Sequence, residues 1–311
     1  MFKVTASPHI RDNMTTQKIM LFVIISLMPA LIGGFVTFGF RALAVTVVCV
    51  ASCMIFEALS RIIMKRSQTV SDLSACVTGI LLAMNLPVTI PLWQAVIGSF
   101  VAVVIAKQLF GGLGQNFVNP AILARIVLML SFTADMTTWV IPRYWKENFD
   151  DIATVTSATP LVSNNASYWD LFIGNTGGCI GEVCAVGLII GGLFLIFTKI
   201  ISPVTPVAFI GTVAVAELIA GNDPLYHILS GGLLLGAFFM ATDYVTTPLT
   251  STGKLIFGIG CGIITFVIRQ FGGYPEGVSF SILLMNIITP YIDNFTAKKA
   301  LGAVYARKEE K

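Results

Sequence analysis

The sequence predicts an all-α integral membrane protein of ten transmembrane helices, arranged as two inverted five-helix repeats with some broken or re-entrant helices. Three observations carry this prediction. Hydrophobic residues fill 56% of the 311 positions and charged residues only 11%, against about 25% charged residues in soluble domains. Apolar segments of membrane-spanning length follow one another along the chain. The two halves of the chain also share an ordered set of residues.

A helix needs about 20 apolar residues to cross a hydrocarbon core of about 30 Å. Candidate spans lie near 19–39, 42–63, 73–90, 92–110, 117–133, 179–198, 200–220, 225–242, 254–271 and 276–292. The third and fifth are short, and they contain Pro87 and Pro120 beside Asn85 and Asn119. Backbone groups freed by proline cannot face lipid, so we expect these two helices to be broken or re-entrant and to line a cavity.

A polar stretch, 135–178, separates the two apolar halves. It divides the chain into a first five-helix repeat (1–134), a loop (135–178), and a second five-helix repeat with a C-terminal tail (179–311). Within the loop, residues 155–161 offer several hydroxyl groups and little bulk. Such a segment is either a solvated connector or a place where an alcohol group is used chemically.

The positive charges predict how the chain crosses the membrane. Cytoplasmic loops of membrane proteins carry an excess of Lys and Arg. In the ten-span arrangement one side collects Lys3, Arg11, Lys18, Arg61, Lys65, Arg66, Lys107, Lys199, Lys254, Lys298, Lys299, Arg307, Lys308 and Lys311. We therefore expect both termini to be cytoplasmic and the 135–178 loop to lie outside.

Residues of the first half recur in the second half at an offset of about 156 to 162 positions. Lys107-Gln108 and the two glycines that follow recur as Arg269-Gln270 and two glycines, and Leu73-Ser74 recurs as Leu229-Ser230. Glu57 in the second span likewise has a counterpart, Glu217, in the seventh. Because five is odd, the second copy enters the membrane from the opposite side, which predicts an inverted repeat with its functional cavity between the halves.

Ionisable residues inside spans are costly and usually turn inward. Glu57 and Glu217 have two interpretations that the sequence leaves open, ion passage or structural pairing with a polar neighbour. The guanidinium of Arg125 has three: it can hold a phosphate, a carboxylate or the carbonyls of a helix end. For Lys107 and Arg269 at helix ends, we expect side chains that extend to the membrane interface.

The cysteines and histidines predict no metal site. There are six cysteines without a CxxC motif and only two histidines. Zinc and iron–sulfur sites need clustered ligands, which this pattern does not supply. His227 is expected to be a packing residue.

A glycine- and asparagine-rich stretch, 111–121, precedes the helix start that Pro120 marks. It can bring the carboxamides of Asn116 and Asn119 against a planar polar ligand. The alternative is a glycine-rich turn that packs tightly in the membrane.

Four motifs together resemble the RnfD/NqrB family, the membrane flavoprotein subunits of Rnf and of Na⁺-translocating NADH:quinone reductase complexes. They are SDLSACVTGILLAMNLP (71–87), GGLGQNFVNPAILAR (111–125), VTSATPL (155–161) and MNIITPYID (285–293). The resemblance runs over nearly the whole chain. Thr-Pro-Leu in the loop motif and the lack of a long amino-terminal extension favour the RnfD branch, and the expected location is the bacterial cytoplasmic membrane.

The resemblance implies a covalent FMN, linked by a phosphoester to a threonine that corresponds to Thr159. Ser157 stands where the family has glycine, and Thr156 is the alternative acceptor. A second, non-covalent flavin, riboflavin, is implied near Asn116 and Asn119. Arg125, in the same motif, completes the residues expected to bind cofactor, and none is expected to be catalytic in its own right.

The function implied is electron transfer within an ion-translocating ferredoxin:NAD⁺ oxidoreductase, coupled to Na⁺ or H⁺ movement. The implied partners are the other Rnf subunits, A, B, C, E and G, a flavin transferase for maturation, and membrane lipid; no nucleic acid is expected. Two alternatives stay open: an NqrB-type subunit with quinone as acceptor, and a channel or solute transporter, because inverted five-helix repeats also build channels.

Overall fold

The computed structural model describes residues 14–142, 156–157, 161, 166–272 and 277–297. Helices dominate this part of the chain, as an all-α membrane protein requires. The first half contains α1 (Thr16–Phe38), α2 (Phe40–Ile63), η1 (Val70–Asp72), α3 (Ser74–Met84), α4 (Leu92–Phe100), η2 (Val101–Gln108) and α5 (Pro120–Ser131). The second half contains α9 (Ala185–Phe197), α10 (Val204–Ala220), α11 (Pro224–Leu229), α12 (Leu233–Leu235), η5 (Gly236–Met240), α13 (Ser251–Phe271) and α14 (Val278–Thr296).

Between the halves lie α6 (Thr133–Met136), β1 (Trp139–Val140), β2 (Thr156–Ser157) and α8 (Tyr168–Ile173). The two strands pair antiparallel, with Trp139 opposite Ser157 and Val140 opposite Thr156. This small ladder was not predicted. It joins the start of the loop to the segment that carries the hydroxyl-rich motif.

Within the described residues, four helices are long and apolar enough to cross a membrane: α1, α2, α13 and α14, with 23, 24, 21 and 19 residues. The helices α3 and α5 have 11 and 12 residues, which at 1.5 Å per residue gives only about 17 to 18 Å. Both helices are therefore short, as the sequence indicates, while their broken or re-entrant course in the membrane stays a prediction.

The eighth predicted span, 225–242, is also broken, although the sequence pattern predicts one continuous helix. It forms α11, α12 and the π-helical segment η5. Ser230 ends α11 in an extended conformation and Gly231 has a φ of 69°, in the left-handed region that favours glycine. A second π-helical segment, η2, ends the fourth span. Such segments are frequent at functional sites.

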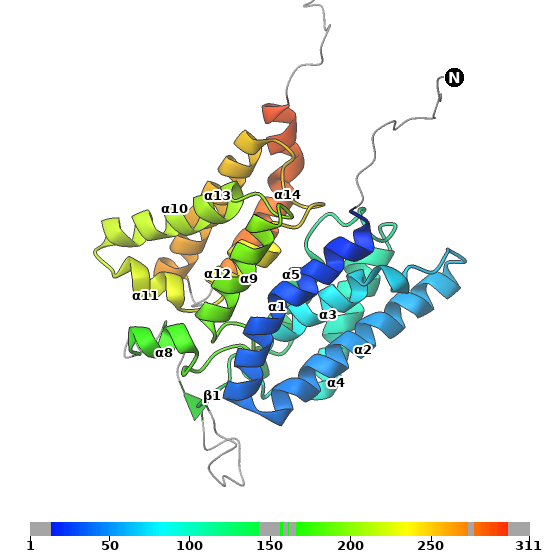
Figure 1. Cartoon of the computed structure of the whole chain (residues 1–311), viewed down its shortest axis with the longest axis horizontal. Coiled ribbons are helices and arrows are strands. Elements are labelled where there is room, and N and C mark those ends of the chain that lie inside the picture. The colour runs from blue at the N-terminus through cyan, green and yellow to red at the C-terminus, as the bar shows by residue number, and fades with distance from the viewer. Residues whose placement is uncertain (1–13, 143–155, 158–160, 162–165, 273–276, 298–311) are drawn as a thin grey trace, which may run out of the picture.

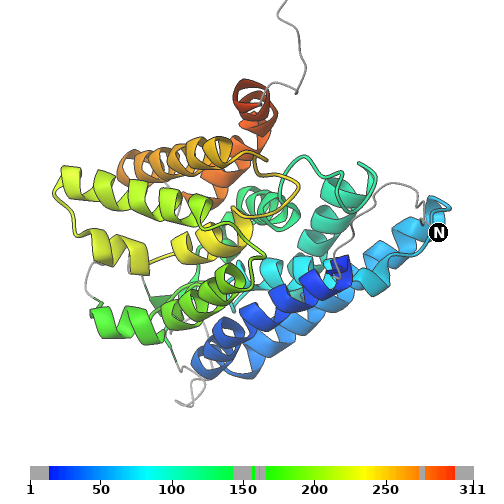
Figure 2. The same cartoon turned by 45° about the horizontal axis from the view of Figure 1, so that its top comes forward.

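The two halves lie side by side, the first in blue to cyan and the second in green to red (Figures 1 and 2). They meet where α1 packs on α9. Glycine allows this close approach, because a Cβ added at Gly187 would lie 2.7 Å from the Cα atom of Ala30. Within the halves, α2 packs on α3 and α4, and α10 packs on α13.

Apolar side chains cover much of the outward surface of the long helices. Val36 on α1, Val47 on α2, Ile263 on α13 and Leu284 on α14 are all exposed. Such surfaces suit lipid and not water, because a soluble protein rarely leaves large contiguous apolar patches uncovered.

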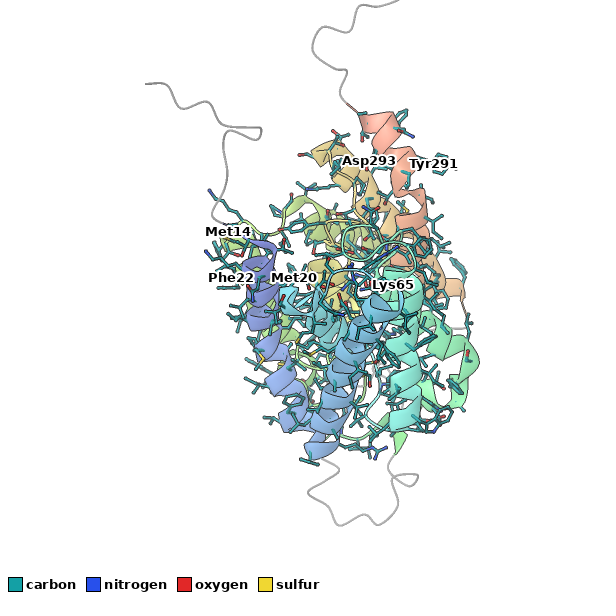
Figure 3. The ribbon with its side chains drawn as sticks, turned by 90° about the vertical axis from the view of Figure 1, so that its right-hand side faces the viewer. Met14, Met20, Phe22, Lys65, Tyr291 and Asp293 are labelled. Atoms are coloured by element: carbon teal, nitrogen blue, oxygen red, sulfur yellow. The ribbon has the colours of Figure 1, made fainter. Side chains whose placement is uncertain are left out.

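The start of α1 and the end of α14 lie toward one end of the molecule, and β1 and α8 lie at the opposite end (Figure 1). Figure 3 shows Met14 and Asp293 toward the first of these ends. The described ends of the membrane part therefore share one face, while the elements of the 135–178 segment lie on the other.

Candidate functional site

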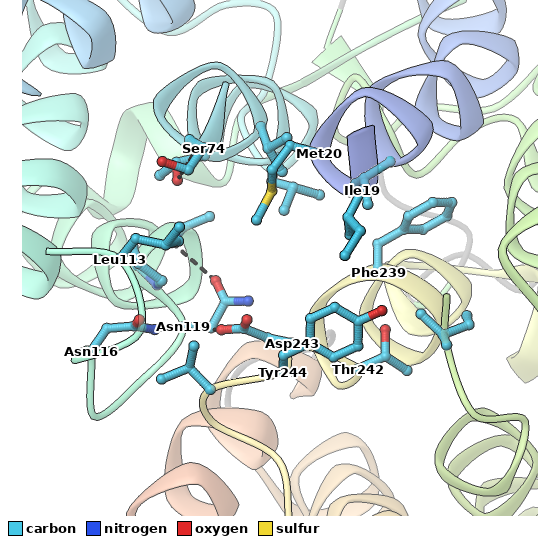
Figure 4. Close-up of a pocket in the computed structure, with 18 of the residues that line it drawn as sticks. Ile19, Met20, Ser74, Leu113, Asn116, Asn119, Phe239, Thr242, Asp243 and Tyr244 are labelled. Atoms are coloured by element: carbon cyan, nitrogen blue, oxygen red, sulfur yellow. Dashed lines mark hydrogen bonds between the residues drawn. The ribbon is translucent and has the colours of Figure 1, made fainter. Parts of the chain in front are cut away.

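A cavity lies between the two halves of the protein, toward the end where α1 begins (Figure 4). It holds about 830 Å³ of space, part of it open to solvent. Ile19 and Met20 of α1 and Phe239 of η5 form apolar walls. Asn116 and Asp243 supply polar atoms at one side. This arrangement, apolar walls with a few converging polar groups, is typical of small-molecule binding sites.

Asn119 lines the cavity, and its carboxamide caps a helix. Its Oδ1 accepts hydrogen bonds from the backbone N–H groups of Ala121 at 3.1 Å and Ile122 at 3.4 Å, at the start of α5. Its Nδ2 donates to the carbonyl of Met240 at 3.3 Å, at the end of η5. Asn with Pro120 after it is a strong local signal for a helix start. The side chain therefore fixes the first turn of α5 against the second half.

Asn116 lies in the same wall and reaches an acidic residue that was not predicted as part of the site. Its Nδ2 donates to the carbonyl of Val118 at 3.1 Å and to Asp243 Oδ2 at 3.4 Å. Asp243 also accepts a hydrogen bond from the hydroxyl of Thr246 at 3.3 Å. The signal for Asp243 in the sequence is a lone carboxylate directly after an apolar run, where ionisable residues tend to be functional.

Lys107 lines the cavity from the side of the first half. Its Nζ lies 2.8 Å from Glu57 Oε2 and 2.6 Å from Ser74 Oγ. Thr69 donates its hydroxyl to the other Glu57 oxygen, Oε1, at 2.7 Å. The expectation that Lys107 extends to the membrane interface is wrong, since the residue is 2% exposed. Of the two interpretations left open for Glu57, the structure shows pairing with polar neighbours, because both of its carboxylate oxygens bind them.

Arg125 is buried on α5 and is not among the residues that line the cavity. Its Nη1 donates to Asn85 Oδ1 at 2.7 Å, and its Nη2 lies 3.5 Å from Cys179 Sγ and 3.6 Å from Glu182 Oε1. The sequence left a phosphate, a carboxylate or helix-end carbonyls as partners of Arg125. In the structure its partner is a carboxylate, that of Glu182. The contacts join α5 and the end of α3 to the segment that leads into α9.

Glu217 is the counterpart of Glu57 in the second half, and it is 0% exposed. Asn222 donates to its Oε2 at 2.8 Å, and His227 Nδ1 lies 3.4 Å from its Oε1. Arg269 donates to the carbonyls of His227 at 2.7 Å and Ser230 at 3.3 Å. His227, expected to be a packing residue, is therefore part of a polar cluster.

Thr159, the predicted flavin acceptor, lies outside the described residues. Two described positions flank it at two residues' distance. Ser157, with Thr156, forms β2 and pairs with β1. Leu161 is partly buried and lines a small pocket with Gly231, next to Glu182. The cavity thus brings Asn116 and Asn119 together, while Thr156, Ser157 and Arg125 lie elsewhere.

Comparison with known families decides the classification. The NQR2, RnfD, RnfE family matches residues 3–302 of the chain. The chain belongs to this family. The membership agrees with the four sequence motifs and with a largely helical membrane architecture.

Relatives in the NQR2, RnfD, RnfE family match nearly the full chain. A protein of Acetobacterium woodii, named as the D subunit of a Na(+)-translocating ferredoxin:NAD(+) oxidoreductase complex, is 49% identical over 99% of this chain and 98% of its own. One of Clostridium ljungdahlii, named as the D subunit of a proton-translocating complex of the same kind, is 41% identical over 97% of this chain and 96% of its own. A protein of Stutzerimonas stutzeri, named as the D subunit of an ion-translocating oxidoreductase complex, is 37% identical over 93% of this chain and 92% of its own.

Proposed function

We propose that this chain is the D subunit of an ion-translocating ferredoxin:NAD⁺ oxidoreductase, the Rnf complex, and carries electrons within it. The observation that supports this most is the 49% identity, over 99% of the chain, to a relative whose name states that reaction. The coupling ion is Na⁺ or H⁺. The names of the two bacterial relatives differ on this point, one sodium and one proton, at 49% and 41% identity.

The membrane arrangement we propose is ten spans in two inverted repeats, with both termini on the cytoplasmic side of the bacterial cytoplasmic membrane. Matched polar clusters support the repeat. Glu57, Lys107 and Ser74 meet in the first half. Their counterparts Glu217, Arg269 and Ser230 also gather in the second half around His227. Its Nδ1 lies 3.4 Å from Glu217 Oε1, and the Arg269 guanidinium binds the carbonyls of His227 and Ser230. The placement of β1 and α8 opposite the start of α1 supports an external 135–178 loop (Figure 1).

The redox group we propose is FMN, joined by a phosphoester to Thr159. When bound, it supplies the electron-accepting and electron-donating chemistry that protein side chains lack. The residues around the site suit the linkage chemically. Thr159 and the alternative acceptor Thr156 offer hydroxyl groups, and Ser157 beside them is small. The described neighbours at 157 and 161 tie this segment to β1 and to the pocket beside Gly231.

A second flavin, riboflavin, is proposed for the cavity between the halves. The lining of the cavity matches the chemistry of an isoalloxazine ring, because such a ring presents apolar faces and a polar edge. Ile19, Met20 and Phe239 would flank the faces, and Asn116 would meet the edge. Asn119 would act through the backbone that it holds, since both ends of its carboxamide already bind protein.

The proposed partners follow from the same assignment. They are the other subunits of the complex, A, B, C, E and G, together with membrane lipid and a flavin transferase that loads Thr159. Ferredoxin and NAD⁺ would bind to partner subunits.

One experiment separates this proposal from its two alternatives. An affinity tag on this chain is used to purify whatever complex it forms, and the preparation is assayed for electron transfer from reduced ferredoxin to NAD⁺ and from NADH to a quinone. The proposal expects the first activity, with the partner subunits in the preparation. NADH:quinone activity instead would indicate an NqrB-type subunit. A chain that purifies alone and without redox activity would indicate a channel or transporter.

A further inference from the structure

The second half of the protein holds a buried carboxylate whose nearest basic neighbour, among the residues that the structure describes, is a histidine. Glu217 Oε1 and His227 Nδ1 are 3.4 Å apart, with side chains 0% and 15% exposed. Within the described part of the chain, neither of these two atoms makes a hydrogen bond. Two buried polar atoms at this distance are costly without a shared proton, because each is removed from water without a partner.

The equivalent cluster in the first half is satisfied without a titrating histidine. Both Glu57 oxygens bind neighbours, one the ammonium of Lys107 at 2.8 Å and the other the hydroxyl of Thr69 at 2.7 Å. In the second half Asn222 binds Glu217 Oε2 at 2.8 Å, and the imidazole of His227 occupies the side of Oε1.

Several charged or titratable groups among the described residues lie around His227. They come from each element packed against it: Glu217 on α10, Asp223 before α11, Arg269 on α13, and Glu182, which acts on Arg269 and forms an ion pair with Arg125. Tyr168 on α8 is neutral and binds Asp223.

A pocket that is open to solvent lies beside His227, on the face that carries α8. It is lined by Ala166, Ser167, Tyr168, Asn222, Asp223, Tyr226 and His227, and it holds about 750 Å³ of space that includes open solvent. Since Nδ1 faces Glu217 while the residue lines the pocket, the imidazole ring stands between the buried carboxylate and water.

We propose that Glu217 and His227 form a proton-binding site that exchanges one proton with the aqueous phase through this pocket. The neutral ring takes a proton from water at the pocket, and the imidazolium then donates its Nδ1–H to the Glu217 carboxylate. Release reverses these steps, and no electron moves. A metal ion fits the pair poorly, since zinc takes four ligands and the described residues contain no group of three or more metal-binding side chains. The site is independent of the flavin assignments.

Carbethoxylation of histidine by diethylpyrocarbonate tests the proposal on the intact purified complex, because the reagent modifies only the neutral ring. The chain has two histidines, His9 and His227, so peptide mass spectrometry separates their modification. The extent of His227 modification is measured against pH, and the midpoint of this curve is the quantity compared between variants.

Glu217→Gln should move this midpoint to lower pH by about one unit or more, since an adjacent carboxylate favours the charged ring. Asp170→Asn, at a partly exposed carboxylate on α8 that binds Asn175 and does not line this pocket, should leave the midpoint unchanged.

The proposal is overturned if Glu217→Gln leaves the midpoint where it is in the unaltered complex. It is equally overturned if His227 stays unmodified at every pH, because the pocket would then give no aqueous access. If Glu217→Gln does not assemble, Glu217→Asp replaces it. That variant keeps the charge but withdraws it by one methylene, so a smaller downward shift supports the proposal and an unchanged midpoint contradicts it. None of these outcomes depends on flavin content or turnover.

Discussion

Lys107 and Glu57 form a salt bridge inside the membrane part of the protein, with Nζ and Oε2 2.8 Å apart and side chains 3% and 0% exposed. The residues are 50 positions apart in the chain, and their contact ties η2 to α2. Ser74 at the start of α3 accepts another bond from the same ammonium at 2.6 Å. One buried cation thus holds three elements of the first half together.

Removing this cation should destabilise the protein strongly. Lys107→Met leaves the Glu57 carboxylate buried without its counter-charge, and breaking a buried ion pair in this way typically costs about 3 to 5 kcal/mol. The measurement is the thermal midpoint of the detergent-solubilised complex. The fraction that stays intact after heating to each temperature is read by size-exclusion chromatography. A Lys107→Met complex as heat-resistant as the unaltered one would show that the pair contributes little.

The double variant Glu57→Gln with Lys107→Met provides the control. It removes both charges, so it should lose less stability than the two single variants together, as contacting residues do in a double-mutant cycle. Simple additivity would contradict the direct pairing.

Two helix glycines should respond differently to the same substitution. Gly187→Ala places a methyl group 2.7 Å from Ala30 Cα, where α1 packs on α9, and overpacking of this kind costs about 1 to 3 kcal/mol. Gly211→Ala on α10 meets no described atom within 4 Å, and its effect should stay within about 0.5 kcal/mol. The thermal midpoints of the two variants measure this difference, and the midpoint of Gly187→Ala should be the lower. Equal midpoints would mean that α1 and α9 are not in close contact.

Asn116→Leu should lower the content of the non-covalent flavin without affecting the covalent one. The substitution removes a carboxamide from the cavity wall and its hydrogen bond to Asp243. Flavin extracted from acid-precipitated complex reports the non-covalent fraction, and the pellet keeps the covalent fraction. Gln115→Leu, at an exposed neighbour outside this cavity, serves as the control. Unchanged extractable flavin in Asn116→Leu would remove Asn116 from the site.

The contact between Tyr168 and Asp223 should hold across neutral pH. Its hydrogen bond keeps the pKa of Asp223 below the ordinary 3.8 and raises the pKa of Tyr168 above the ordinary 10.0. A lowered carboxyl pKa means that the contact is present above 3.8 and is lost as pH falls through the lowered value. The raised phenol pKa means that it is lost on the alkaline side only above 10.0.

Hydrogen–deuterium exchange of the α8 peptide at about pH 6, 7 and 8, corrected for intrinsic rates, measures this contact. Tyr168→Phe should reduce protection by the same factor at each pH, about threefold or less because the pair is exposed to solvent. A factor that changes across this pH range would contradict the assignment, since neither group should titrate there.

Local signals in the sequence predicted local structure well. Asn119 and Pro120 indicated the start of α5, because a capping side chain and a proline act on the turn that they occupy. The short third and fifth spans were likewise visible. The break in the eighth span was not, since Ser230 and Gly231 lie in an otherwise apolar run and their effect depends on how the halves pack.

Contacts between distant residues could not be predicted in the same way. The repeat aligned Glu57 with Glu217 and Lys107 with Arg269, yet it did not say that Glu57 and Lys107 touch. Asn116 meets Asp243, which is 127 positions away. Such pairs follow from three-dimensional packing, so one sequence indicates the chemistry available but not the partners.

Electron transfer by this chain depends, in our proposal, on FMN attached to Thr159, and peptide mass spectrometry detects that linkage itself. The complete complex is made together with its flavin transferase, this chain is digested, and the peptide that contains residues 155–161 is fragmented. We expect an FMN phosphoester localised to Thr159, which Thr159→Ala abolishes without loss of the protein from the membrane and Thr156→Ala leaves intact. An adduct on Thr156, or no adduct at all in the complete complex, would show that the assignment is wrong.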